Sequence, residues 1–417
     1  MKHDIVPALA RLTRFLLKTQ LKKIQHGRLR LIEGEVEDVF GKITPEGPFD
    51  VTIRVHNSRF YSDVVLAGTL GSGEAYINGH WQCDNLTDLV RLMVFNRDLM
   101  NDVDSGWSRV SAPLFKFVHW LNRNDKSGAQ RNIAAHYDLG NEFFALFLDE
   151  TMAYSCGIFP NQHASLLQAS TAKFDAVCSK LDLKPGQRLL EIGTGWGGLA
   201  IHAAQHYGCH VTTTTISRAQ YEFSKERIAR AGLNDQVTLL LEDYRDLKGK
   251  YDALASIEMI EAVGHEYLDT YFRQCSQLLN PNGAMLLQAI SIQDQFYHQA
   301  RRSVDFIKRF IFPGSFIPSV GVILASVARV TDMKVYHLED IGPHYARTLK
   351  LWRERFTARL GDVRSLGYPE TFIRMWEFYL SYCEGGFEER QLGNVQMLLT
   401  KPRSRRAAIT TIHAPAS

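Results

Sequence analysis

Residues 189–198 read LLEIGTGWGG, a short apolar run with one carboxylate that is followed by Gly193, Gly195, Gly197 and Gly198. An apolar run of this length is typical of a buried strand, and the residues after the glycines have the pattern of a helix. Because glycine has no side chain, the loop can turn tightly and a ligand can approach its backbone at the helix N-terminus. The stretch therefore predicts a strand, a ligand-binding loop and a helix, in that order.

Strand and helix patterns alternate downstream of this loop. The strand patterns are RLLEI (188–192), HVTTTT (210–215), VTLLLE (237–242), YDALASIE (251–258), GAMLLQAI (283–290), KVYHL (334–338) and VQMLLT (395–400), the last expected at a sheet edge. Helices are expected between them, one over residues 198–206 and another that Ser217 N-caps and Gly232 ends. Strands separated by such helices predict a doubly wound parallel α/β sheet, with ligands at the carboxyl ends of the strands.

The N-terminal region has a different pattern. VTIRVHN (51–57) and RFYSDVVLAG (59–68) alternate as strands do, and the region breaks at glycine and proline. We predict a smaller α+β domain over residues 1–115, a polar linker within 100–130, the larger domain over 130–405 and a tail over 406–417. An insertion of aromatic and basic residues after the strand at 283–290 is expected to form a lid over an apolar substrate.

The composition points to the cytoplasm. Of 417 residues, 45% are hydrophobic and 22% charged, and no apolar stretch approaches the roughly 20 residues that span a bilayer. The six cysteines are scattered without metal-binding spacing, which fits a reducing compartment. The start, MKHDIVPALARLTRF, lacks the apolar segment and cleavage site of a secretory signal.

Basic charge is concentrated at the N-terminus. The net charge is only +3, whereas the first thirty residues hold eight lysines and arginines against one acid, Asp4. Apolar residues follow helical spacing in the same stretch, at Ile5, Leu9, Leu12, Phe15, Leu16 and Leu21. The pattern predicts a basic amphipathic helix. Such a helix suits an anionic membrane surface, and the pattern equally fits a helix docked on the protein with a solvated basic face.

The glycine spacing by itself fits two kinds of ligand, a dinucleotide and S-adenosylmethionine. Glu191 lies in the strand before the glycines, where its carboxylate can accept a hydrogen bond from a ligand's amino group. The second strand continues as TTTTISRAQ and lacks the acidic residue that usually binds the ribose of a dinucleotide. These two features favour S-adenosylmethionine.

Eight stretches along the chain match one known family. In order they are AHYDLGNEFFALFLDETMAYSCGIF (135–159), LLEIGTGWGGLA (189–200), TISRAQ (215–220), EDYRDL (242–247), MIEAVG (259–264), YFRQCSQLLNPNGAMLL (271–287), FIFPGSFIPS (310–319) and YCEGGFEERQLGNVQMLL (382–399). Together they resemble the cyclopropane-fatty-acyl-phospholipid synthase family, S-adenosylmethionine-dependent methyltransferases of unsaturated acyl chains. GSGEAYINGHW (71–81) also resembles the extra domain of its phospholipid-acting members. The resemblance implies a class I, Rossmann-like methyltransferase domain with an aromatic lid, and it suggests a homodimer.

The resemblance also implies which residues hold the cofactor. Carried over position by position, the cofactor contacts are Tyr154, Ser155, the loop from Gly193 to Gly197, the stretch from Thr215 to Gln220, and Tyr244. The chemistry of these side chains agrees, since Ser217 and Gln220 offer hydrogen bonds near the ribose and Tyr244 can cover the adenine. His136 and Tyr137 precede a helix pattern and fit helix entry as well as cofactor contact.

The implied reaction begins with a cis double bond, a weak nucleophile whose attack on a sulfonium methyl leaves a carbocation. An aromatic face and a carboxylate stabilise such a cation, and Tyr345 and Glu261 occupy the family's positions for these roles. A base must then remove a proton from the methyl-derived carbon so that the ring closes. The resemblance implies a bound bicarbonate as this base, held by residues matching Cys156, Glu261, a histidine, Ile290 through its backbone, and Tyr345.

The sequence departs from that pattern at the histidine, where Gln288 stands, and at Glu258, where many members have a small residue. Glutamine donates hydrogen bonds but does not titrate, so the anion site is expected to be weaker or the base to differ. Without ring closure, a hydride shift and loss of a neighbouring proton give a methyl- or methylene-branched chain. Cys383 is expected near the substrate channel, in packing rather than in catalysis.

Three classes of function follow from these patterns. The first is methylene transfer to cis-unsaturated acyl chains of membrane phospholipids, by a protein attached peripherally to the inner face of the membrane through residues 1–30 and the basic stretch 401–406. The second, motivated by Gln288, is a lipid-binding protein that has lost catalysis. The third, a nucleic-acid methyltransferase, is disfavoured because the basic residues are interleaved with a lipid-type amphipathic pattern and no base-flipping motif is present.

Overall fold

The computed structural model describes residues 2–97, 139–407 and 409, and of residues 2–10 it describes the backbone alone. Contacts gather the described residues into two compact units. The first unit draws on Met1–Arg123, Gln295–Gly314 and Tyr345–Leu392, and the second on Asn124–Asp294, Ser315–His344 and Gly393–Ser417. The contacts thus interleave segments of the chain, whereas the sequence pattern divides it once, at a linker within 100–130 that lies outside the described residues.

The second unit is built on a seven-stranded sheet in the order β10-β11-β9-β8-β5-β6-β7. Its strands are β5 (Arg188–Ile192), β6 (His210–Thr214), β7 (Val237–Leu240), β8 (Tyr251–Ile257), β9 (Leu279–Ile292), β10 (Lys334–Asp340) and β11 (Leu392–Thr400). The run from β9 to β7 pairs in parallel, whereas β10 and β11 pair in antiparallel fashion. The predicted α/β class is confirmed, with a mixed rather than wholly parallel sheet.

The last strand does not lie at the edge predicted for it. β11 lies between β9 and β10, and its residues 394–400 are all buried. A strand buried on both faces belongs in the interior of a sheet, where other elements cover both of them. The edge is formed instead by β10, in which five of the seven residues are exposed.

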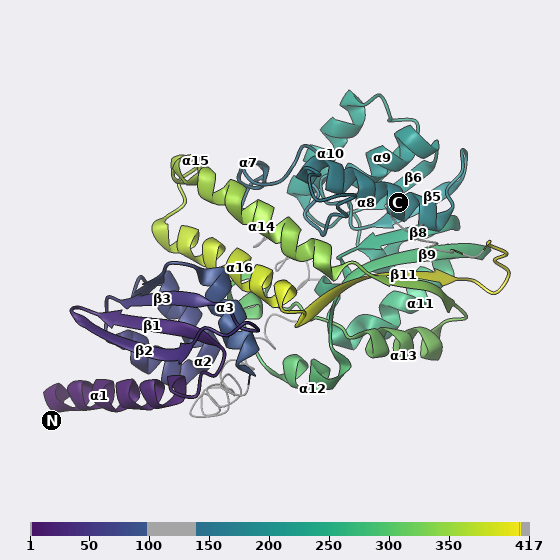
Figure 1. Cartoon of the computed structure of the whole chain (residues 1–417). Coiled ribbons are helices and arrows are strands. Elements are labelled where there is room, and N and C mark those ends of the chain that lie inside the picture. Colours follow the sequence, from purple (N-terminus) through teal and green to yellow (C-terminus); the bar gives the residue numbers. More distant parts are fainter. Residues whose placement is uncertain (1, 98–138, 408, 410–417) are drawn as a thin grey trace, which may run out of the picture. The chain divides into compact units, whose positions relative to one another are not determined.

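Helices cover both faces of this sheet (Figure 1). One face carries α8 (Leu166–Leu181), α9 (Gly198–Tyr207) and α10 (Arg218–Arg230), and the other carries α11 (Leu268–Leu278) and α13 (Val320–Val330). The unit also contains short helical turns: α7 (Asn141–Ala145) before α8, η1 (Tyr244–Asp246) after β7, and η2 (Ile260–Ala262) and η3 (His265–Tyr267) after β8. The predicted N-cap of α10 is confirmed, because Oγ of Ser217 accepts a hydrogen bond from the N–H of Gln220 at 3.3 Å.

The first unit contains the N-terminal α+β region that the sequence predicts, together with two segments, 295–314 and 345–392, that the sequence pattern assigned to the larger domain. Its four-stranded sheet has the order β2-β1-β3-β4, formed by β1 (Gly27–Glu33), β2 (Val36–Lys42), β3 (Asp50–Val55) and β4 (Trp81–Cys83). Its helices are α1 (Lys2–Leu21), α2 (Arg59–Ile77), α3 (Leu86–Phe95), α12 (Asp294–Arg302), the π-helix η4 (Ile307–Ile311), α14 (Gly342–Ala358), α15 (Leu360–Ser365) and α16 (Glu370–Glu388). The first residues of α12 and α14 belong to the second unit, because the boundaries between the units fall at Gln295 and Tyr345.

The strand predicted over residues 59–68 is wrong, because these residues begin α2. Phe60, Tyr61 and Val64 are all buried in that helix, and positions three and four residues apart, as Val64 is from the other two, lie on one helical face. Short apolar runs fit both kinds of element, and packing against neighbouring elements decides between them. The preceding stretch, 51–55, does form a strand, β3.

The aromatic insertion contributes to the core of the first unit. Phe306 is fully buried, and its ring lies 4.6 Å from that of Phe378 in α16. A Cβ atom on Gly73 of α2 would collide with the ring of Phe306, so glycine is required there for close packing. A role of this insertion as a lid stays a prediction.

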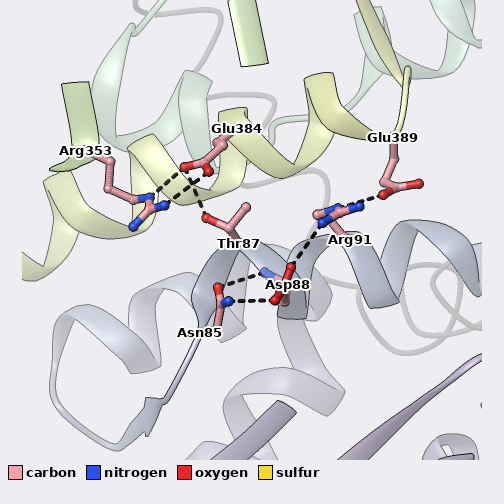
Figure 2. A network of polar contacts seen from close by, with 7 residues as sticks. All are labelled: Asn85, Thr87, Asp88, Arg91, Arg353, Glu384 and Glu389. Carbon is pink, nitrogen blue, oxygen red and sulfur yellow. Dashed lines mark hydrogen bonds and ion pairs between the residues drawn. The ribbon is translucent and has the colours of Figure 1, made fainter. Parts of the chain in front are cut away.

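Polar contacts around the buried carboxylate of Glu384 join the N-terminal and C-terminal segments of this unit (Figure 2). Glu384 of α16 is 3% exposed and accepts hydrogen bonds from Nε of Arg353 at 2.6 Å and from Oγ1 of Thr87 at 3.2 Å. Nearby, Arg91 of α3 donates to Glu389 at 2.8 Å. Because a buried carboxylate needs such donors, these contacts fix α3 against α16.

We expect Glu384→Ala to destabilise the protein by about 3 kcal/mol, because removing one partner of a buried ion pair leaves the Arg353 guanidinium and the Thr87 hydroxyl without their acceptor. Denaturant unfolding of the full chain measures the change. Glu388→Ala, at an exposed position of the same helix, serves as the matched control and should change stability by less than about 0.5 kcal/mol. Equal stability of the two variants would contradict the assigned role.

Candidate active site

The glycine loop lies between the carboxyl end of β5 and the start of α9. Gly193, Gly195 and Gly197 have φ values of 101°, 54° and 84°, in the left-handed region that glycine adopts without strain. A Cβ atom on Gly195 would meet nothing within 4 Å, whereas one on Gly193 would lie 3.2 Å from Cγ of Met259. The loop therefore leaves bare backbone beside an open space at Gly195 and is closely packed at Gly193.

The tryptophan of the loop anchors it to the second unit. Trp196 is 2% exposed, its Nε1 donates to Oδ1 of Asn141 at 2.7 Å, and its ring lies 4.9 Å from that of Phe144. Its carbonyl accepts from Arg227 of α10 at 2.7 Å, and the same guanidinium group binds the carbonyl of Thr151 at 3.0 Å. Arg227 thus ties the loop to the segment that leads to Tyr154, a contact that no sequence motif indicated.

Glu191 is held inside β5, directly before the loop. It is 3% exposed, and its Oε2 accepts a hydrogen bond from Oγ1 of Thr213 at 2.6 Å. Thr213 in turn lies 2.7 Å from the hydroxyl of Thr194 in the loop. Burial raises the pKa of Glu191 to about 8. A cationic amino group placed beside this carboxylate would favour its charged form.

The side chains after β6 and β7 are ordered by one another. Oγ1 of Thr215 donates to Oε1 of Gln220 at 2.9 Å and accepts from the N–H of Ser217 at 3.1 Å. Tyr244, in η1, packs edge-on against Tyr271 at 5.5 Å, and its buried hydroxyl has no hydrogen-bond partner among the described residues. Such an orphaned hydroxyl is suited to a polar ligand.

A buried lysine lies behind the segment 154–156. Lys173 of α8 is 2% exposed and donates to Oγ of Ser155 at 2.9 Å. Burial lowers its pKa, while Glu258 and Glu191 are among the acids that counteract this shift. The ring of Tyr154 packs on Phe144 at 5.2 Å. Lys173 gave no signal in the sequence, because a lysine in an amphipathic helix ordinarily faces solvent.

A second group of polar side chains gathers where β8 and β9 end. Oε1 of Glu258 accepts hydrogen bonds from the N–H of Cys156 at 3.0 Å, from Nε2 of Gln288 at 2.8 Å and from Nδ2 of Asn394 at 2.6 Å. Oε1 of Gln288 accepts from Nε2 of Gln396 at 2.9 Å. The cluster is polar although Gln288, Asn394 and Gln396 are fully buried in strands of the central sheet. The sequence indicated Gln288 and Glu258 as departures from the family pattern, whereas Asn394 and Gln396 showed only as alternating polar residues in the apolar stretch 394–399.

Glu261 completes this group. In η2, its Oε1 accepts a hydrogen bond from the N–H of Ile290 at 2.6 Å, while its buried Oε2 has no partner among the described residues. Burial, followed by the charge of Glu258, raises the pKa of Glu261 to about 8. The structure therefore brings Cys156, Glu261, Gln288 and Ile290 together, as a shared role requires.

Two further predicted site residues belong to the other unit. Tyr345 and Cys383 belong to the first unit, where the ring of Tyr345 lies 4.5 Å from that of Phe387 and burial raises the pKa of the Cys383 thiol. Their roles at the reacting centre stay predictions. His136 and Tyr137 lie outside the described residues.

These features fit S-adenosylmethionine. The open space beside Gly195 and the buried carboxylate of Glu191 suit its amino-acid part. Ser217 and Gln220 would hold its ribose, and Tyr244 would lie at its adenine.

Comparison with known proteins agrees with this fit. The family model for mycolic acid cyclopropane synthetase matches residues 124–397. Tuberculostearic acid methyltransferase UfaA1 of Mycobacterium tuberculosis is 38% identical, over 80% of this chain and 79% of its own. The cyclopropane-fatty-acyl-phospholipid synthase of Escherichia coli is 37% identical, over 86% of this chain and 90% of its own. The solved structure of mycolic acid cyclopropane synthase CmaA1 complexed with SAH and CTAB matches 65% of this chain and 98% of that chain, at 31% identity and a TM-score of 0.61.

We expect the affinity for S-adenosylhomocysteine to rise by up to about tenfold per pH unit between pH 6 and 8, because Glu191 must lose its proton to bind the ligand's ammonium group. Isothermal titration calorimetry measures this slope. Glu191→Gln should bind more weakly and with a flat pH profile, whereas Glu226→Gln, at an exposed position of α10, should retain both affinity and slope. A steep slope in Glu191→Gln would assign the titration to another group.

Proposed function

Since the chain belongs to the mycolic acid cyclopropane synthetase family, we propose that it transfers a methylene group from S-adenosylmethionine to the cis double bond of unsaturated acyl chains in membrane phospholipids. That it is an S-adenosylmethionine-dependent C-methyltransferase follows from the family and its relatives. The observation that carries the finer proposal is the pair of carboxylates, Glu258 and Glu261, beside the glycine loop. The likeness to the Escherichia coli phospholipid enzyme, over 86% of this chain, supports the substrate.

The carboxylates supply what the reaction needs most. S-adenosylmethionine brings an electrophilic methyl group, and the alkene that takes it becomes a carbocation. Glu261, half-buried and close to Glu258, offers negative charge to this cation in its ionised form, where little water competes. Tyr345 would add its aromatic face by the cation–π attraction.

Bicarbonate, the base that the family resemblance implies, does not fit these residues. Two of the N–H groups expected to hold it, those of Cys156 and Gln288, donate to Glu258, and a third, that of Ile290, donates to Glu261. A further anion would enter beside two carboxylates, at an unfavourable Coulomb energy. The proposed reaction therefore proceeds without bicarbonate.

A branched product is the second candidate. It is favoured by Gln288, whose amide is held between Glu258 and Gln396 and does not exchange protons. The likeness to a tuberculostearic acid methyltransferase, at 38% identity, points the same way. Here the cation would shift a hydride and lose a neighbouring proton, so that the product has a methylene branch, or a methyl branch beside a retained double bond.

Access to lipid is proposed through α1 and the adjoining strand. Lys18 of α1 pairs with Asp38 of β2 at 2.5 Å, and Leu17 and Leu21 are buried, so the helix is docked on its own unit. Phe15 and Leu12 nevertheless remain 66% and 54% exposed, and Val36 and Val39 of β2 are 54% and 55% exposed. Leu12, Phe15 and Val36, called the α1–β2 patch, belong to the same N-terminal region as the basic residues and suit an anionic bilayer.

None of the helices among the described residues is long and apolar enough to cross a bilayer. We therefore propose a cytoplasmic protein attached peripherally to the inner face of the membrane through the α1–β2 patch. We also propose that the protein forms a homodimer, as the resemblance suggests.

Mass spectrometry of fatty acids, after incubation of the protein with monounsaturated phospholipid vesicles and methyl-labelled S-adenosylmethionine, tests the activity. We expect labelled chains heavier by one CH₂ group and without an olefin. Labelled chains that keep the olefin would establish the branched product instead. No labelled lipid would contradict both candidates.

We expect the double variant Leu12→Ser/Phe15→Ser to bind vesicles of anionic phospholipid at least about tenfold more weakly, because two large side chains no longer enter the interface. Vesicle cosedimentation measures binding. Leu167→Ser, which alters an exposed leucine of α8, serves as the control and should bind as the unchanged protein does. Equal binding by the double variant would exclude the α1–β2 patch as the attachment site.

A further inference from the structure

Glu258 lies at the centre of the sheet edge where ligands bind. It directly follows β8, which lies between β5 and β9, so it stands at the carboxyl end of the strand next to the glycine loop. Met259, the next residue, approaches the Cβ position of Gly193 to 3.2 Å. In a doubly wound sheet this is the crevice that receives the ligand.

The backbone at Glu258 is strained. Its φ is 48°, in the left-handed region that costs a residue with a side chain roughly 1 kcal/mol relative to glycine. Strain of this kind persists where the surroundings fix it, and such positions cluster at active sites. The side chain is therefore kept at a conformational cost, which points to a use for the carboxylate.

Three nitrogen donors hold one oxygen of this carboxylate. Cys156, Gln288 and Asn394 all donate to Oε1, from the segment after α7 and from strands β9 and β11. Donors converging from three parts of the chain fix the direction in which the carboxylate points. They also suit an anionic acceptor, since hydrogen bonds to charged groups are the strong ones.

Gln288 is oriented by a relay behind it. Its Oε1 accepts from Nε2 of Gln396, and Oε1 of Gln396 accepts from Nζ of Lys180 at 2.5 Å. Because the amide oxygen of Gln288 accepts the hydrogen bond from Gln396, the amide NH₂ group lies on the opposite side. The relay therefore turns the N–H of Gln288 toward Glu258, where a neutral donor supports a carboxylate without competing for its proton.

We propose that the carboxylate of Glu258 is the base of the reaction, with Gln288 as its positioning residue. The inference rests on the proposed methylene transfer. After the methyl group has bonded to one alkene carbon, a C–H bond of that methyl group breaks and its proton passes to Glu258. The electron pair left behind forms the C–C bond that closes the ring, and the carboxylic acid later releases the proton to water.

The neighbouring acid agrees with this assignment. Burial and the charge of Glu258 together raise the pKa of Glu261 to about 8, because two carboxylates this close repel each other. The two carboxyl groups have different hydrogen-bond partners, so they can divide the tasks of cation stabilisation and deprotonation. A built-in carboxylate also explains why the N–H groups expected to hold bicarbonate are already occupied.

The test combines a variant with chemical rescue. Glu258→Gly removes the carboxylate and suits the left-handed backbone, so folding is favoured. We expect turnover to fall about 10²- to 10⁴-fold, with the affinity for S-adenosylhomocysteine unchanged, and added formate to restore part of the turnover when chloride at equal ionic strength does not. Glu266→Gln, at an exposed position of η3, should react normally.

Bicarbonate removal provides a second measurement that needs no variant. The unchanged protein should form product at the same rate in buffer freed of carbon dioxide and in buffer with added bicarbonate. A rate that depends on bicarbonate, full turnover in Glu258→Gly, or a loss that formate does not restore would each overturn the assignment of Glu258. Absence of any labelled lipid with the unchanged protein would instead be a failure of the proposed function.

Discussion

Carboxylates removed from water at the ends of parallel strands are the constraint on which this molecule depends. Glu191, which is buried, and Glu258 and Glu261, which are half-buried, lie at or beside the carboxyl ends of β5 and β8 and accept hydrogen bonds from the protein. The donors come from β6, β9, β11 and the segment after α7. The sheet, the glycine loop and the segment 149–156 therefore have to be correctly placed relative to one another, and this placement also shapes the ligand site.

The same principle holds the first unit together. Glu384 of α16 is buried against Arg353 and Thr87, and a residue this polar is stable there because both donors reach it. Aromatic packing around Phe306 adds apolar contacts from the insertion. Segments that are far apart in the sequence, including one the sequence suggested as a lid, thus form one compact unit.

Much of the second unit was predictable from local patterns. The strand at 188–192, the helix that follows the glycines and the N-cap of Ser217 depend on nearest neighbours, and all three were found where the sequence predicted them. The errors occurred where a pattern allowed two outcomes. Residues 59–68 fit strand and helix alike until packing selected the helix, and the central place of β11 was decided by cover on both faces.

The sequence by itself determined the glycine loop, the carboxylate before it and the family, because these are carried by residues close together in the chain. It showed Gln288 only as the absence of a histidine. The tertiary structure decided that Gln288 faces Glu258, because the parallel pairing of β8 with β9 sets Ile257 opposite Gln288 and so places the next residue, Glu258, within hydrogen-bond distance. Sheet register depends on packing across the whole unit, so the contact between Gln288 and Glu258 is found in the structure and could not be predicted from the sequence.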